Sequence, residues 1–187
     1  ERTGDKAKKA PQVYDIENFS ASYSFNEIVR RNINVKQDIR RDYMGSLNYT
    51  YQTQPKPVEP FKKVKFLQSE HLALVRDFNF YWYPKNFTVI GTLNRSYNIL
   101  QARDIELDIP NGLPVTYNKS FTFNRQYSLL YDITKSLKFD FNARMNTRID
   151  ELSGAPDTTG NREEIWKNLK NFGRPTNYHQ TVNLNWQ

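Results

Sequence analysis

The 187-residue chain contains no cysteine, two histidines and seven glycines. The absence of cysteine excludes disulfide bonds, thiolate catalysis and zinc sites built on Cys ligands. The scarcity of glycine excludes collagen-like and glycine-linker sequences. No run of about 18 apolar residues is present, so the sequence predicts no helix that spans a bilayer. The hydrophobic fraction is only 37%, which suits a protein whose apolar residues lie on one face.

Aromatic rings and basic charge are what the chain has in excess. Phe, Tyr and Trp make up 14% of the residues, which argues against disorder, and the net charge is +7. A basic chain suits nucleic acid, an anionic lipid surface or an acidic partner. The rings recur along one whole side of every predicted strand, however, which is too many for a base-stacking platform. We therefore expect no nucleic-acid partner.

Apolar and polar residues alternate along seven segments, and this period of two predicts β-strands. Several of these strands are longer than the usual 5–6 residues and long enough to cross a bilayer when tilted. The segments are 18–26, 43–52 (with alternation reaching back to residue 33), 77–83, 87–100, 115–131, 137–150 and 178–186.

The polar positions of these strands are mainly Ser, Thr, Asn and Gln, as in the hydrated wall of a membrane barrel. We therefore predict an all-β fold, an antiparallel transmembrane β-barrel wall segment of about seven long strands. The residues predicted to face the lumen are Asn18, Ser20, Ser22, Ser24, Asn118, Ser120, Thr122, Asn124, Asn142, Asn146, Thr181 and Asn183. Those predicted to face lipid are Phe19, Tyr23, Phe25, Phe87, Val89, Phe121, Phe123, Phe139, Phe141, Leu184 and Trp186.

The connections divide into short turns and long loops. Short turns are predicted near residues 31–32, 84–86 and 132–135, and long loops at 53–72, 101–114 and 151–177. Short turns on the periplasmic side and long loops on the extracellular side are the outer-membrane pattern. Residues 161–172 predict a short helix inside the last loop, because an acidic start is followed by lysines and then by Gly173. Residues 1–13 are expected to form a charged loop, and 14–187 the barrel segment, cut from a longer chain.

Two arginines, Arg95 and Arg125, stand at positions where the alternation calls for apolar residues. Counted from the short turns, both are predicted about 18–21 Å above the periplasmic side, at one shared level. That level is the outer interface, where a guanidinium binds lipid phosphate. We therefore predict contact with lipopolysaccharide, and structural tolerance of Ala at both positions.

Catalytic and metal-binding chemistry finds little support. His71 and His179 are interpreted as solvated or hydrogen-bonded side chains. Asp104, Glu106 and Asp108 share one face near a long loop, a set of oxygens that calcium favours, but solvated loop charge is the preferred interpretation. No phosphate loop, Gly-x-Ser-x-Gly elbow or His-Glu-x-x-His motif is present. We predict no enzyme, no catalytic residue, no metal and no cofactor.

The chain resembles the SprA/Sov family, the outer-membrane translocon of type IX secretion in Bacteroidota. The resemblance runs from about residue 14 to the end, and its most specific part is a Pro-rich loop followed by LALVRDFN. The segments that carry it are YSFNE (23–27), YMGSLNYTY (43–51), PFKKVKFL (60–67), LALVRDFNF (72–80), LNRSYN (93–98), FNRQYS (123–128), DITKSLK (132–138) and NTRID (146–150).

The resemblance implies a very large single-chain barrel in the Gram-negative outer membrane that moves folded cargo proteins to the cell surface. It also implies an outer-membrane shuttle protein and a periplasmic plug protein as partners, and a role in gliding motility in some members. Two alternatives stay open. One is the wall of another large barrel, such as a TonB-dependent transporter, and the other is a soluble all-β binding domain.

Overall fold

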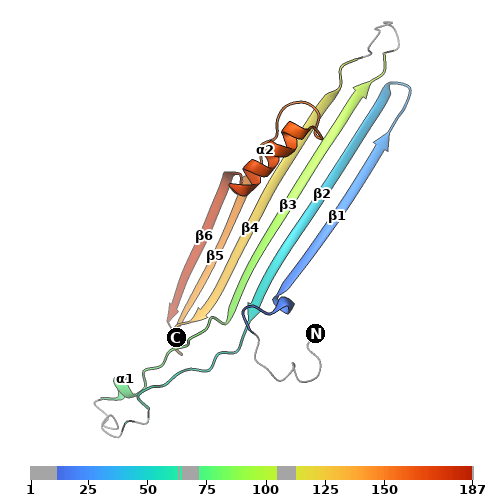
Figure 1. Cartoon of the computed structure of the whole chain (residues 1–187). Coiled ribbons are helices and arrows are strands. Elements are labelled where there is room, and N and C mark those ends of the chain that lie inside the picture. Colours follow the sequence, from blue (N-terminus) through green and yellow to red (C-terminus); the bar gives the residue numbers. More distant parts are fainter. Residues whose placement is uncertain (1–11, 63, 65–71, 105–112, 187) are drawn as a thin grey trace, which may run out of the picture.

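The computed structural model describes residues 12–62, 64, 72–104 and 113–186. Within them the chain forms one open, six-stranded antiparallel sheet in the order β1 to β6 (Figure 1). The all-β, antiparallel prediction is confirmed. The strands are β1 Phe19–Arg30, β2 Val35–Gln52, β3 Asn86–Ala102, β4 Thr116–Asp132, β5 Leu137–Arg148 and β6 Arg174–Trp186.

In the described part of the chain, three short helical segments accompany the sheet. They are η2 Ile16–Asn18, α1 Ala73–Arg76 and α2 Thr159–Lys170. The last confirms the predicted loop helix, and it begins where the Thr158 hydroxyl accepts a hydrogen bond from the Asn161 amide at 3.3 Å. Among the described residues, no helix is both long enough and apolar enough to cross a membrane.

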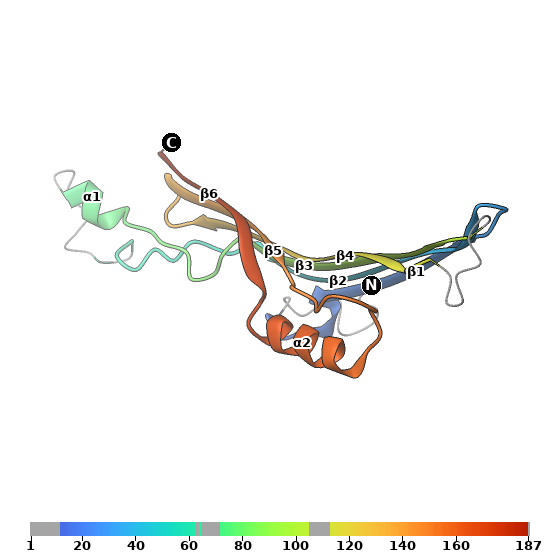
Figure 2. The same ribbon diagram turned by 90° about the horizontal axis from the view of Figure 1, so that it is seen from above.

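The strand register keeps the alternating residues on opposite faces across the whole sheet. Residues paired directly in antiparallel strands project from the same face. One row joins Phe19, Tyr49, Val89 and Tyr127 across four strands. We call the face that carries this row the ring face, and the opposite one the polar face. Seen from above, the sheet is bowed and α2 lies on its convex side (Figure 2).

The prediction of a seventh strand at residues 77–83 is wrong. In this segment only an isolated bridge forms, between Phe80 and Val58. The alternating rings pack beside one another instead, with Phe78 6.1 Å and Trp82 5.2 Å from Phe80 between ring centroids. A segment with alternating residues becomes part of a sheet only when a neighbouring strand pairs with it. Here no such strand of the described chain pairs with 77–83, and the rings form a small cluster with Phe61 instead.

The predicted separation of short turns from long loops is also wrong. Because 77–83 does not return along the sheet, the connection between β2 and β3 leaves and re-enters at one end. That end also carries the β4–β5 turn, since the Lys85 amide donates to the Leu130 carbonyl at 2.8 Å. The β1–β2 turn lies at the opposite end with the connection that holds α2 (Figure 1). Each end therefore has one short turn and at least one long connection.

Residues 149–173, which include α2, fold back over the ring face, and we call them the cap loop. The Ile149 amide donates to the Phe121 carbonyl at 2.9 Å, and Ile149 and Tyr97 are each 1% exposed. Elsewhere the single-layer sheet leaves its rings open: Tyr23 is 72% and Trp186 82% exposed. Among the described residues the buried hydrophobic side chains are few, and Tyr97, Phe121 and Ile149 are the ones at the cap loop.

The cap loop rejoins the sheet through two residues with left-handed backbone, Phe172 (φ 60°) and Gly173 (φ 70°). A Cβ on Gly173 would lie 2.7 Å from the Arg148 carbonyl oxygen and 2.6 Å from Ile149 Cδ1. We therefore expect Gly173→Ala to weaken docking of the cap loop by about 1–3 kcal/mol, measured by hydrogen exchange of the α2 amides.

Gly45→Ala is the matched control, because a Cβ at Gly45 meets nothing within 4 Å. Exchange at α2 should be unchanged in that variant. Equal exchange in the Gly173 variant and the wild-type protein would show that this junction does not hold the cap loop.

Candidate functional site on the two faces of the sheet

The register gathers the predicted lumen-facing residues that lie in strands onto the polar face. Ser22 pairs with Ser46, Ser120 with Ser96, and Asn142 with Ser128 and Thr181. Asn18 is the exception, because it lies in η2 and its side-chain amide donates to the carbonyls of Gln12 and Val13. The predicted lipid-facing residues all lie on the ring face.

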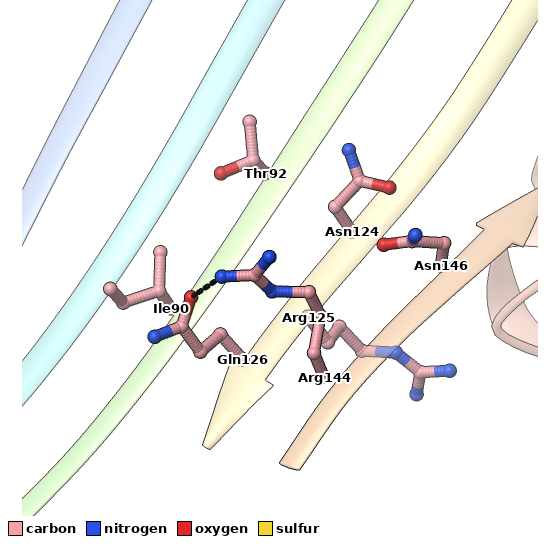
Figure 3. Close-up of a pocket in the computed structure, with 7 residues that line it drawn as sticks. All are labelled: Ile90, Thr92, Asn124, Arg125, Gln126, Arg144 and Asn146. Atoms are coloured by element: carbon pink, nitrogen blue, oxygen red, sulfur yellow. Dashed lines mark hydrogen bonds between the residues drawn. The ribbon is translucent and has the colours of Figure 1, made fainter. Parts of the chain in front are cut away.

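A shallow hollow of about 270 Å³ lies on the polar face between β3, β4 and β5 (Figure 3). Its polar lining includes Thr92, Asn124, Gln126, Arg144 and Asn146. One Arg144 Nη donates to Gln126 Oε1 at 3.4 Å, as the dashed line in Figure 3 shows. The polar groups of its lining are therefore hydroxyl, amide and guanidinium groups, with Arg125 and Arg144 as the charged members. Across the described residues, no group of three potential metal ligands is found.

On the ring face, apolar rows follow one another from Phe123 to Tyr131 along β4, and the row of Leu137 and Trp186 continues them. We call these rows the apolar band. The band covers about ten residue steps, or about 33 Å along a strand. At a tilt of about 45° this is about 23 Å along a barrel axis, close to the roughly 25 Å apolar band of outer-membrane barrels.

Two rows above the band lies a charged row, which the sequence interpretation missed. Glu27, Arg41, Tyr97 and Lys119 are paired in register across β1 to β4. Arg41 forms an ion pair with Glu27 and donates to the Tyr97 hydroxyl at 2.9 Å. The sequence signal for this row is the alternation itself. If the period of two is continued past residue 26 in β1 and back before residue 43 in β2, Glu27 and Arg41 lie on the ring face. This charged row interrupts the apolar surface, because the ring-face row beyond it is again apolar and consists of Val29, Ile39, Ile99 and Tyr117.

Arg95 is bound to protein rather than open to lipid. Its guanidinium donates to both carboxylate oxygens of Glu151 at 2.9 Å and to the Pro156 carbonyl at 3.2 Å. The Glu151 side chain is 4% exposed and that of Arg95 19%. The prediction of a phosphate partner and a tolerated Ala is therefore replaced by a buried ion pair that holds the cap loop.

Asn161 organises the cap loop around this pair. It is fully buried and its amide donates to Glu151 at 2.9 Å and to the Pro156 carbonyl at 2.7 Å, while its oxygen accepts from the Leu152 amide at 2.8 Å. Burial of Glu151 opposes ionisation, but hydrogen bonds from Arg95 and Asn161 outweigh it and hold the pKa of this carboxyl below its usual value.

Phe121 and Phe123, both predicted to face lipid, meet the cap loop instead. Phe121 is 8% exposed, and the Phe123 ring stacks on Phe172 with centroids 6.4 Å apart. The Arg125 guanidinium lies 5.1 Å from the Phe123 centroid and 4.9 Å from that of Phe172. These contacts are cation–π interactions, which stabilise a guanidinium in an apolar setting.

The predicted shared level of Arg95 and Arg125 is wrong. Arg95 pairs with Phe121, whereas Arg125 pairs with Gly91. The two arginines are therefore about four residue steps apart, or about 13 Å along the strands. The count failed because it started from a hairpin turn at 84–86 that the structure does not contain. Arg125 lies one row inside the apolar band, and Arg95 lies one row above it.

Of the two histidines and the acidic cluster, the described residues include His179 and Asp104. His179 is exposed on β6, with its Nε2 3.3 Å from the Thr181 hydroxyl. His71, Glu106 and Asp108 lie outside the described residues, as do residues 1–11 of the predicted N-terminal loop.

Removing the charge of Glu151 should release the cap loop. In Glu151→Gln the Arg95 guanidinium stays buried without an anionic partner, which we expect to cost about 3 kcal/mol of docking free energy. Hydrogen exchange of the α2 amides measures this, with Glu163→Gln on the exposed side of the same helix as control. Equal exchange in both variants would contradict the role of the ion pair.

The pH dependence of cap-loop docking provides a second test of the ion pair between Arg95 and Glu151. A carboxyl with a lowered pKa stabilises the docked state above its ordinary titration range, near 4.3, and loses this contribution as the pH falls through the lowered value. The protection of the α2 amides, taken relative to their intrinsic exchange rates, should therefore weaken progressively as the pH falls from the ordinary range of a glutamate through the lowered pKa of Glu151. This weakening should be absent in Glu151→Gln.

The family resemblance rests on the sequence segments quoted above. No protein-family model matches the chain, and no curated protein matches it. The geometry is thus the main support for a function: a long, bowed, one-layer sheet with one polar face and one face that carries the apolar band and the charged row.

Proposed function

We propose that this sheet is part of the wall of a very large outer-membrane β-barrel, the protein-conducting channel of type IX secretion. The observation that carries the proposal is the register, which holds one apolar and one polar face across six strands of 12–18 residues. Such strands are long enough to cross a bilayer when tilted. The ring face then meets lipid and the polar face lines a hydrated path.

The shape of the sheet supports this orientation. The cap loop and the ring face lie on the convex side of the bow, so the polar face lies on the concave side (Figure 2). In a closed barrel the concave side is the lumen and the convex side meets lipid. Most strand positions of the polar face are small and uncharged, and its charges include Arg144 and the ion pair of Arg40 with Asp42. A largely uncharged polar surface suits the passage of proteins of varied surface.

The strand lengths agree with the same placement. β5 and β6 have 12 and 13 residues and end near the upper edge of the apolar band, whereas β2, β3 and β4 have 17 or 18 and continue above it. The charged row and the cap loop occupy this additional length. Trp166 of α2 is 63% exposed beside Lys167, as expected for a helix at a membrane interface.

The open edges require further strands. β1 and β6 each pair on one side only within the described part of the chain, and β6 does not return to β1. In lipid, every unpaired backbone group on such an edge costs several kcal/mol. A barrel of about eight strands has an interior filled by side chains, so only a much larger barrel leaves room for a protein. We therefore infer that both edges pair with other strands of one large wall.

Neighbouring positions on β5 test the membrane orientation. Phe141 pairs with Leu129 and Val182 near the middle of the apolar band, whereas Asn142 lies on the polar face. We expect Phe141→Arg to cost about 2–4 kcal/mol of stability in lipid, and Asn142→Arg to be mild. The measurement is denaturant unfolding of the full-length protein in lipid vesicles. Equal costs at the two positions would contradict the assignment of the faces.

Cargo contact tests conduction itself. A benzophenone side chain at position 142 should form covalent adducts with secreted proteins during export in living cells. The same group at position 141, its matched control on the other face, should form adducts with lipid and none with cargo. Cargo adducts at position 141, or none at position 142 while export proceeds, would rule out the proposed path.

A further inference from the structure

An apolar groove of about 590 Å³ lies on the ring face beside the cap loop. Its size is within the range of ligand sites in proteins. Two glycines form its floor, Gly45 on β2 and Gly91 on β3, and they are offset by two residue steps because Gly45 pairs with Leu93 and Gly91 with Leu47. Neither glycine projects a side chain, so the surrounding residues stand above a notch. The main walls are Tyr23, Leu47, Tyr49, Val89, Phe123 and Phe172.

The only ionic group of the groove is Arg125, which lines the end nearest the cap loop. Among the described residues its partners are two aromatic rings and the Met145 sulfur, which accepts from one Nη at 3.0 Å. Its Nε is buried without a hydrogen-bond partner. The described residues thus supply this cation with no oxygen acceptor, whereas Arg95, one strand away, has a carboxylate and a carbonyl.

We propose that this groove binds one membrane lipid, with an acyl chain over Gly45 and Gly91 and an anionic headgroup on Arg125. The proposal rests on the proposed function, since it requires the ring face to be in a membrane. Arg125 lies one row below the upper edge of the apolar band, a depth from which a long side chain extends to the headgroups. An anionic oxygen there provides the hydrogen bonds that the rings and the sulfur do not.

The experiment uses the full-length protein in nanodiscs that contain phosphatidylglycerol or phosphatidylcholine with a photoreactive diazirine in the acyl chain. Mass spectrometry of the cross-linked peptides gives the position of each lipid. We expect severalfold more labelling at Tyr23, Tyr49 and Phe172 than elsewhere on the ring face, and more with phosphatidylglycerol than with phosphatidylcholine.

Two variants separate the contributions of the chain and the headgroup. Gly45→Leu fills the notch without a backbone clash, since a Cβ there meets nothing within 4 Å, and should abolish the enrichment for both lipids. Arg125→Gln should remove the preference for phosphatidylglycerol and leave labelling by phosphatidylcholine unchanged. Arg144→Gln on the polar face is the charge-matched control and should alter neither.

The outcomes distinguish this proposal from the function on which it rests. Uniform lipid labelling over the ring face, without enrichment in the groove, overturns the lipid site and leaves the barrel wall intact. Absence of lipid labelling at Phe141, Val182 and Leu184, which lie on β5 and β6 outside the groove, overturns the barrel wall itself. A protein segment cross-linked in the groove in place of lipid, or an unchanged lipid preference in Arg125→Gln, also overturns the proposal.

Discussion

The continuous antiparallel register is the constraint on which the rest of this structure depends. Side chains alternate along a strand with a period of two, so a slip of one residue in any pair would move a whole strand's rings to the polar face. The five strand pairs keep one register over most of their length, and the two one-residue shifts, between Val35 and Gln37 and between Asn146 and Thr147, lie near strand ends. The apolar band, the charged row and the groove all follow from this alignment.

The cap loop provides protein contacts for ring-face residues that do not suit a lipid surface. Above the apolar band the ring face carries Arg95 and the charged row, and the cap loop brings Glu151 and Asp157 to them. At the band's upper edge it brings Phe172 to Arg125. The cap loop therefore provides partners for the charges of the ring face, at the height where a membrane would end.

Much of this fold follows from the alternation in the sequence alone. Six of the seven predicted strands form, because their rings and polar residues both find partners in adjacent strands. β1 runs four residues beyond the predicted end because Glu27, which breaks the alternation, pairs with Arg41 on β2. The segment 77–83 shows the opposite case, since its alternating rings cluster with Phe61 outside the ladder.

The functional details depend on contacts that local patterns do not contain. Arg95 and Glu151 are 56 positions apart, and Phe172 meets Phe123 only because the cap loop folds back over the sheet. Sequence alternation therefore identified Arg95 and Arg125 as exceptions, but it placed both at one level and did not show that Glu151 binds Arg95. Predicting the levels of the two arginines on the sheet also required the true course of the β2–β3 connection. The alternation at 77–83 indicated a strand there that does not form.

The central claim is that the two faces of one sheet meet two different solvents. Spin labels placed singly along residues 137–148 of β5 in the full-length protein in lipid test it most directly. We predict that quenching by oxygen, which partitions into lipid, peaks at odd positions such as 139 and 141, and that quenching by a water-soluble nickel chelate peaks at even positions such as 140 and 142. Uniform quenching of all positions by the water-soluble reagent would contradict the account.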